Sequence, residues 1–157
     1  METGTTSSQA RIDEVVAEAA DRDLVVVSTM NAASVDVDTG QPTASAAAQQ
    51  ALVSALLATG RPVVISGMRN PYDISHLTEA PTYLVTYGFT AASMESLTRV
   101  LFGEVDPVGK LPGSNPGTST DDKRLVTGLW PAAVVGSQPL TGWGCMDGLR
   151  HAGWAGR

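Results

Sequence analysis

The chain has 157 residues, of which 43% are hydrophobic and 17% are charged, so a wholly disordered polypeptide is excluded. Its 10 basic and 16 acidic residues give a net charge of −6, and the absence of a basic stripe argues against nucleic acid as a partner. The one cysteine, Cys145, excludes an intramolecular disulfide framework and a cysteine-based zinc site.

Residues 1–8 are small and polar, and we expect them to form a flexible N-terminus. They lack the basic and apolar regions of a signal peptide, and no run approaches the roughly 18 apolar residues of a membrane span. We therefore expect no membrane partner and, by default, a cytoplasmic location. A fragment of a secreted protein would lack such a signal as well.

Helical periodicity begins at about residue 9. Apolar side chains recur there with the spacing of one helix face, at Ile12, Val15, Val16, Ala19 and Ala20. Ser7 or Ser8 precedes this pattern, and a serine in that position can cap a helix by accepting a bond from an unpaired amide. The continuous apolar run in residues 23–28 then predicts a strand that is covered on both faces.

Residues 31–43 read as a loop, and a second helix is predicted from Thr43 or Ser45 to Thr59, where Gly60 ends it. Residues 62–66 predict another buried strand. After the turn at Asn70–Pro71 we expect a short helix over 72–77, a third strand over 82–87, and a third long helix over about 90–102 that ends at Gly103.

Strands that alternate with helices imply right-handed crossovers and a mainly parallel sheet. The predicted fold is therefore an α/β domain, a three-layer α/β/α sandwich of flavodoxin-like character. We place this domain at 9–112 and interpret 113–157 as an irregular, Gly/Pro/Ser-rich extension or tail. Within that segment, 125–135 can form a strand or a short helix, and the three tryptophans either pack back on the domain or lie in a poorly structured tail.

The sequence contains none of the motifs of nucleophilic, metal or phosphate chemistry. No Gly-x-Ser-x-Gly elbow and no phosphate-binding glycine loop is present, and His76 and His151 lack metal-ligand spacing. Asp36 and Asp38 match only a fragment of a calcium loop, so a solvated loop is the better interpretation. We expect no catalytic residue, no metal and no cofactor, and give Cys145 no catalytic role.

Paired carboxylates are the remaining route to chemistry, because glycoside cleavage needs two carboxyl groups roughly 5–10 Å apart. Asp73 and Glu104 are the candidates, each in a turn at the end of an element. The simpler alternative is that Asp73 caps the short helix after Pro71 and that Glu104 is solvated.

Three stretches together resemble the C-terminal α/β-sandwich domain of family 3 glycoside hydrolases, and most closely the bacterial β-N-acetylhexosaminidase-like branch. They are DLVVVSTMNA in 23–32, QQALVSALLATGRPVVI in 49–65 running on to RNPYDI in 69–74, and VLFGEVDPVGKLP in 100–112. The resemblance covers roughly residues 10–112. It implies an α/β sandwich, in agreement with the helix and strand pattern.

The resemblance also implies that the nucleophile lies elsewhere. In this family the nucleophilic aspartate is on an N-terminal (β/α)8 barrel, which needs about 250 residues. In the β-glucosidase-like branch, a glutamate in the loop after the strand that resembles 24–27 acts as the acid/base. Here that loop reads Ser-Thr-Met-Asn in 28–31, without a carboxylate, which favours the hexosaminidase-like branch and predicts a domain that is inactive alone.

We therefore expect an accessory domain whose partner is a (β/α)8 barrel, separately encoded or missing, and which meets carbohydrate only through that partner. The residues expected at the substrate cleft or interdomain rim are Asn31, Arg69, Asn70, Tyr72, Asp73, Tyr87 and Phe89. Alternatively, Arg69 and Asp73 only hold the Asn70–Pro71 turn. A non-catalytic carbohydrate-binding or protein-docking module is the second hypothesis, and a flavodoxin-like signalling domain is the third.

Overall fold

A computed structural model describes residues 4, 6–107, 126–127 and 133–135. The first three helices and strands are α1 (Gln9–Ala19), β1 (Val25–Thr29) and α2 (Ala44–Ala58). They are followed by β2 (Val63–Gly67), the 3-10 helix η1 (Pro71–His76), β3 (Thr82–Val85) and α3 (Ala91–Leu101). Two short strands, β4 (Val126–Thr127) and β5 (Ala133–Val135), complete the described elements.

Each of the three α-helices among the described residues begins at a hydroxyl cap. Ser8, Thr43 and Thr90 accept hydrogen bonds from the amides of Arg11, Ala46 and Ser93 at 3.3, 3.2 and 3.3 Å. Such caps satisfy amides that the first helical turn leaves unpaired. Gly60 and Gly103, directly after the C-caps of α2 and α3, have φ of 71° and 68°. The helix limits expected from the sequence are thereby confirmed to within a few residues.

The sheet has the strand order β1-β2-β3-β5-β4, in which the pairs β1–β2 and β2–β3 are parallel. β5 pairs antiparallel with β3, and β4 pairs antiparallel with β5. These two short strands lie inside residues 113–157. The predicted α/β architecture with a mainly parallel sheet is confirmed.

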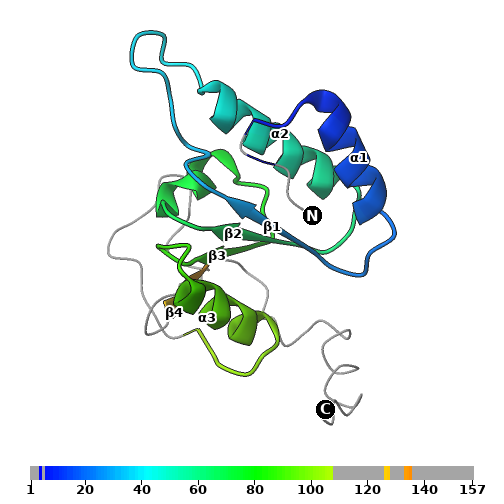
Figure 1. Cartoon of the computed structure of the whole chain (residues 1–157), viewed down its shortest axis with the longest axis vertical. Helices are drawn as coiled ribbons and strands as arrows, with labels where there is room; N and C mark the ends of the chain where they lie inside the picture. The colour runs from blue at the N-terminus through cyan, green and yellow to red at the C-terminus, as the bar shows by residue number, and fades with distance from the viewer. Residues whose placement is uncertain (1–3, 5, 108–125, 128–132, 136–157) are drawn as a thin grey trace.

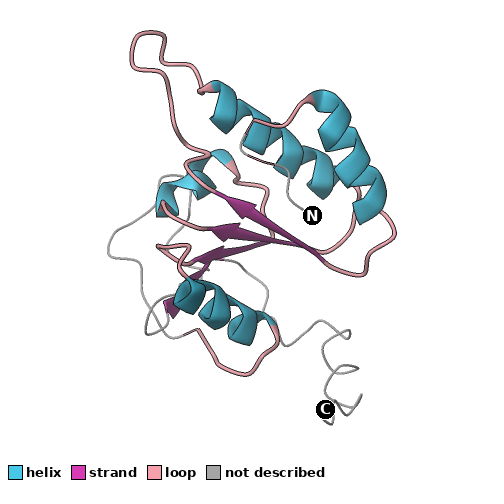
Figure 2. Cartoon of the chain, viewed as in Figure 1, coloured by secondary structure: helices cyan, strands magenta, loops and turns pink. Residues whose placement is uncertain are grey.

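Helices cover the sheet on both faces (Figures 1 and 2). On one face α1 and α2 pack with η1 in the larger core cluster, which includes Leu52, Leu56 and Ile65. On the other face α3 packs on Val64 and Leu84 in a smaller cluster. Burial of these branched side chains is the main favourable term for folding. The arrangement is the three-layer sandwich expected from the sequence.

Candidate functional site

The carboxyl ends of β1, β2 and β3 meet at one edge of the sheet, because the three strands are parallel (Figure 2). In an open α/β sheet this is the edge at which ligands and partners usually bind. All of the rim residues expected from the sequence lie in the segments that leave these strands or in η1: Asn31, Arg69, Asn70, Tyr72, Asp73, Tyr87 and Phe89.

Asp73 connects two of these segments. Its side chain is fully buried, and its carboxylate accepts hydrogen bonds from the Thr29 hydroxyl at 3.0 Å and from the Ala33 amide at 3.1 Å. The expectation that Asp73 caps the short helix is wrong. Asn70 is the cap, since its Oδ1 accepts from the Tyr72 amide at 2.9 Å. Asp73 instead binds the segment after β1 to the helix after β2.

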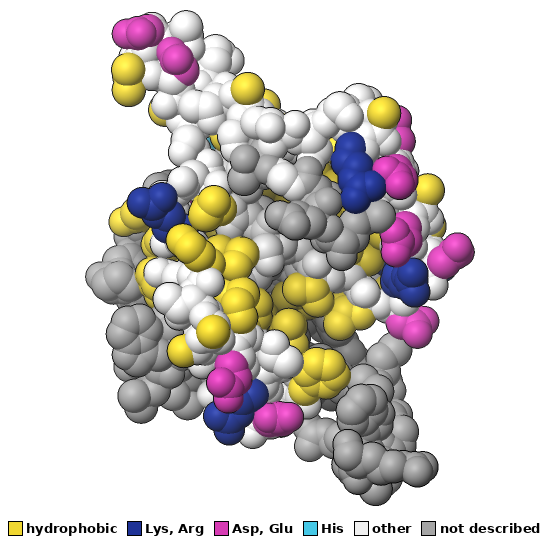
Figure 3. All heavy atoms as spheres, in the orientation of Figure 1, with side chains coloured by type: hydrophobic (Ala, Val, Ile, Leu, Met, Phe, Trp, Pro, Cys, Tyr) yellow, Lys and Arg dark blue, Asp and Glu magenta, His cyan; other side chains and the backbone are white. Residues whose placement is uncertain are grey.

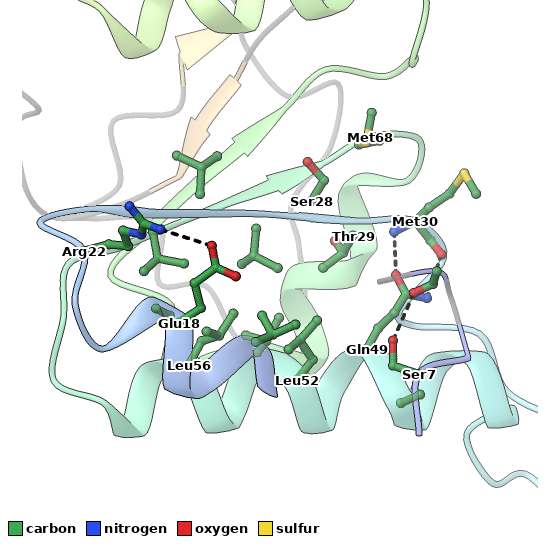
Figure 4. A pocket seen from close by; sticks show the side chains of 18 of the residues that line it. Ser7, Glu18, Arg22, Ser28, Thr29, Met30, Gln49, Leu52, Leu56 and Met68 are labelled. Atoms are coloured by element: carbon green, nitrogen blue, oxygen red, sulfur yellow. Dashed lines mark hydrogen bonds and ion pairs between the residues drawn. The ribbon is translucent and has the colours of Figure 1, made fainter. Parts of the chain in front are cut away.

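Two glutamines of α2 also hold this segment, and Figure 4 shows the contact of Gln49 with Met30. Gln49 accepts from the Met30 amide at 2.8 Å and donates to the Met30 carbonyl at 3.0 Å. Gln50 donates to the Ala32 carbonyl at 2.7 Å. The sequence pattern did not predict a role for these residues. The available signal was an adjacent pair of amides on a helix that is otherwise rich in Ala and Leu, where a buried polar group needs a partner.

The segment after β2 is placed by a close approach between Gly67 and Tyr83. A Cβ on Gly67 would overlap the Tyr83 hydroxyl and would lie 2.7 Å from its Cζ. That hydroxyl donates to the Asn70 carbonyl at 3.4 Å. Burial, together with the charge of Asp73, raises the pKa of Tyr83 above its ordinary value. The ring therefore remains a neutral hydrogen-bond donor over the physiological range.

Two residues at this edge have left-handed backbone conformations. Asn31 has φ of 60° and Tyr87 has φ of 53°. Asparagine tolerates this region, whereas a bulky residue adopts it only when its surroundings enforce it. Next to Tyr87, the Thr86 hydroxyl donates to the Gly88 carbonyl at 2.7 Å. Among described residues the buried Tyr87 hydroxyl finds no partner, and burial raises the pKa of Tyr87.

Beyond these fixed segments the edge presents three large exposed side chains. Arg69 is exposed, and the described part of the chain offers its guanidinium no carboxylate partner. The rings of Tyr72 and Phe89 are 51% and 62% exposed. Arginine, tyrosine and phenylalanine are each enriched in protein interfaces. The edge thus combines a rigid backbone with side chains that are available for contact.

The structure does not bring the two candidate carboxylates together. α3 starts at the carboxyl edge and runs back along the sheet, so Glu104, which follows its end, lies at the opposite edge. There Glu104 pairs with Arg99 at 3.4 Å. Asp73 is fully buried and already accepts two hydrogen bonds, so it is unsuited to proton transfer with a substrate.

The other chemical candidates are equally limited. Asp36 accepts hydrogen bonds from the amides of Thr39 and Asp38, and these lower the pKa of its carboxyl. This is the solvated loop expected from the sequence. In the part of the chain that the structure describes, no group of three or more metal-ligating side chains occurs. Cys145 and His151 lie outside the described residues, as do the three tryptophans.

None of the helices among the described residues is both long and apolar enough to cross a membrane.

Comparison with family models gives a match that extends over residues 3–135. The matching family is the glycosyl hydrolase family 3 C-terminal domain. Searches of curated proteins and of solved structures found no match. The family match covers most of the chain and includes both short strands, β4 and β5.

Proposed function

This chain belongs to the family of glycosyl hydrolase family 3 C-terminal domains, and from this we propose that it is an accessory domain that docks on a (β/α)8 barrel carrying the catalytic nucleophile. In this proposal the carboxyl edge of the sheet is the docking surface. Two features of that edge support the proposal. Hydrogen bonds to Asp73 and Gln49 fix its backbone. The side chains of Arg69, Tyr72 and Phe89 are exposed there and available for contact.

We propose further that the domain does not hydrolyse glycosides by itself. The family resemblance supports a nucleophile on the barrel, and residues 28–31, at the end of β1 and directly after it, contain no carboxylate. Its Thr29 hydroxyl is buried and donates to Asp73. A hydroxyl has too high a pKa to act as a general acid near neutral pH. These features support the β-N-acetylhexosaminidase-like branch, in which the barrel supplies both catalytic groups.

The first test is an assay of the purified chain on chromogenic N-acetylglucosaminide and glucoside substrates, with the expectation of no turnover. Turnover that a point change in this domain abolishes would contradict the proposal.

The second test measures binding of the chain to a separately expressed barrel domain of a bacterial family 3 β-N-acetylhexosaminidase. Phe89→Ala and Arg69→Ala should weaken this binding. Phe102→Ala is the matched control, because its ring is 59% exposed, close to the 62% of Phe89, but follows α3 at the opposite edge. Equal effects of the two phenylalanine variants would contradict docking through the carboxyl edge.

The exposed rings favour a second candidate function, a carbohydrate-binding module. Tyr72 and Phe89 are more than half exposed at the same edge, and sugar rings bind to such faces. Calorimetric titration with chitobiose distinguishes the two candidates. Binding that is lost in Tyr72→Ala and retained in Phe102→Ala would favour the carbohydrate-binding function over docking.

A further inference from the structure

The outer strand β1 leaves one side of the sheet unpaired. Its inner side bonds to β2, since the Val25 amide donates to the Pro62 carbonyl and the Thr29 carbonyl accepts from the Met68 amide, both at 2.9 Å. Hydrogen-bonding direction alternates along a strand, so the backbone groups of Val26 and Ser28 point away from β2. No described residue pairs with these groups.

Helix α1 lies beside this free edge, where it lines one wall of a groove. Val15 and Ala19 of α1 and Leu52 of α2 lie on one side, and residues from both faces of β1 lie on the other (Figure 4). Gly4 and Ser7, which precede α1, also line the groove. The groove has a volume of about 610 Å³. It therefore follows the strand edge and offers apolar walls to anything that pairs with β1.

The opposite face of β1 lacks the cover that parallel sheets normally have. α3 packs on Val64 and Leu84 of the neighbouring strands, but Val26 remains 43% exposed. Hydrophobic side chains gather between the helix pair and α3 in the space-filling view (Figure 3). Parallel strands are usually buried on both faces, so β1 has the composition of an inner strand at an outer position.

The described side chains that line the groove carry no net charge, although the whole chain has a net charge of −6. Among the described residues, Glu18 and Arg22 are the charged side chains that line it, and they pair with each other at 3.1 Å (Figure 4). Because the two charges offset each other, the groove has no net charge that would attract a charged segment, and it complements an uncharged one. A charged side chain placed there would lose water without gaining an opposite charge.

A second copy of the chain is a poor occupant. Two copies could pair their β1 edges around a two-fold axis to form one continuous sheet. In that dimer the α1 helices of both copies would lie on the same face of the sheet, next to the paired β1 strands. Since α1 already lines the groove beside its own β1, the two helices would compete for that space. A single extended segment avoids this conflict.

We propose that the free edge of β1 binds an uncharged extended segment of another polypeptide, rich in β-branched residues, as an added strand. Its backbone pairs with the amides and carbonyls of Val26 and Ser28, and its side chains contact the α1 wall on one face and Val26 on the other. Such strand addition takes affinity from main-chain hydrogen bonds and specificity from alternate side chains. Met68 and Phe89 of the carboxyl edge also line the groove, but the proposal is tested without a barrel domain.

The probe is a fluorescein-labelled peptide with the β2 sequence PVVISG, flanked by one lysine at each end, titrated into the full chain and followed by anisotropy. We expect saturable binding. A peptide that is N-methylated at alternate residues should still bind. In an extended peptide alternate N–H groups point to opposite sides, so the side without methyl groups keeps all of its hydrogen-bond donors. A peptide methylated at every amide should lose about tenfold or more in affinity.

Val26→Lys tests the protein side, because a charge on an edge strand opposes pairing. It should weaken peptide binding by about tenfold or more. Val37→Lys is the matched control, since Val37 is 94% exposed in the loop after β1 and should leave binding unchanged.

Three results would overturn the proposal. The first is no binding at millimolar peptide. The second is equal binding of the fully methylated and unmethylated peptides, which would indicate apolar adhesion alone. The third is a dimer in light scattering that Val26→Lys dissociates. The last result assigns the edge to a second copy. Failure of the barrel-docking test leaves all of these measurements interpretable, because they use the chain and the peptide only.

Discussion

The carboxylate of Asp73 lies 3.0 Å from the hydroxyl of Thr29, although 44 positions separate the two residues in the chain. The second carboxylate oxygen accepts from the Ala33 amide at 3.1 Å. One buried side chain therefore fixes the position of the segment after β1 relative to η1. The geometry of the proposed docking edge depends on this contact.

Asp73→Ala should destabilise the fold by about 2–4 kcal/mol, because it leaves the buried Thr29 hydroxyl and the half-buried Ala33 amide without their acceptor. Asp73→Asn keeps one acceptor oxygen and should cost less. Urea unfolding, followed by far-UV circular dichroism, measures both differences.

Glu79→Gln is the control for Asp73→Asn, since Glu79 is exposed and the same chemical change there should shift the free energy of unfolding by less than about 0.5 kcal/mol. If Asp73→Ala proved as stable as this control, the contacts with Thr29 and Ala33 would not contribute to stability.

Gly67→Ala should destabilise the fold by about 1–3 kcal/mol, because the added methyl group overlaps the buried Tyr83 ring. Tyr83→Phe alone loses one long hydrogen bond to the Asn70 carbonyl and should cost about 0.5–1.5 kcal/mol. In the double variant the missing hydroxyl relieves part of the overlap. A double-mutant cycle by urea unfolding should therefore give a favourable coupling energy, and strict additivity would argue against the overlap.

Asn31→Ala should cost about 1 kcal/mol, because alanine is disfavoured at φ of 60°. Asn31→Gly should be close to neutral, since glycine adopts this conformation freely. Thermal and urea unfolding of the two variants measure the difference. Glu79 provides the control position: it is exposed and its φ is not positive, so glycine should not be better than alanine there.

The sequence was sufficient to predict the helices, the parallel strands and the layers. Capping hydroxyls such as Ser8 and Thr43, and stop glycines such as Gly60, act within a few residues of each helix end. Continuous apolar runs likewise identify buried strands from local sequence. β4 and β5 were harder to predict, because strands of two and three residues carry almost no periodic signal.

The site was predictable in position but not in its contacts. Loops after parallel strands converge, so Arg69, Tyr72 and Phe89 could be placed at one edge from the strand order alone. The role of Asp73 could not be predicted, because its local context favours a helix cap and its real partners lie 40 and 44 positions away. The left-handed backbone at Tyr87 has no sequence signal, since tyrosine has no preference for that conformation.

Stability should fall with pH above about 10, and Tyr83 should account for part of the loss. Burial raises the pKa of Tyr83 in the folded chain above its unfolded value near 10. Above that value the unfolded chain releases the phenolic proton while the folded chain retains it. The contribution of this group is therefore complete below pH 10 and declines as pH rises, at up to about 1.4 kcal/mol per pH unit.

Urea unfolding of the wild-type chain and of Tyr83→Phe between about pH 8 and pH 11.5 tests this expectation. The difference between the two free energies of unfolding should be constant below about pH 10 and shrink above it, because the variant cannot titrate at this position. Asn31→Ala, which weakens the fold but keeps the phenol, should remain parallel to the wild type. A Tyr83→Phe curve that also stayed parallel would mean that burial of this phenol does not couple its proton to folding.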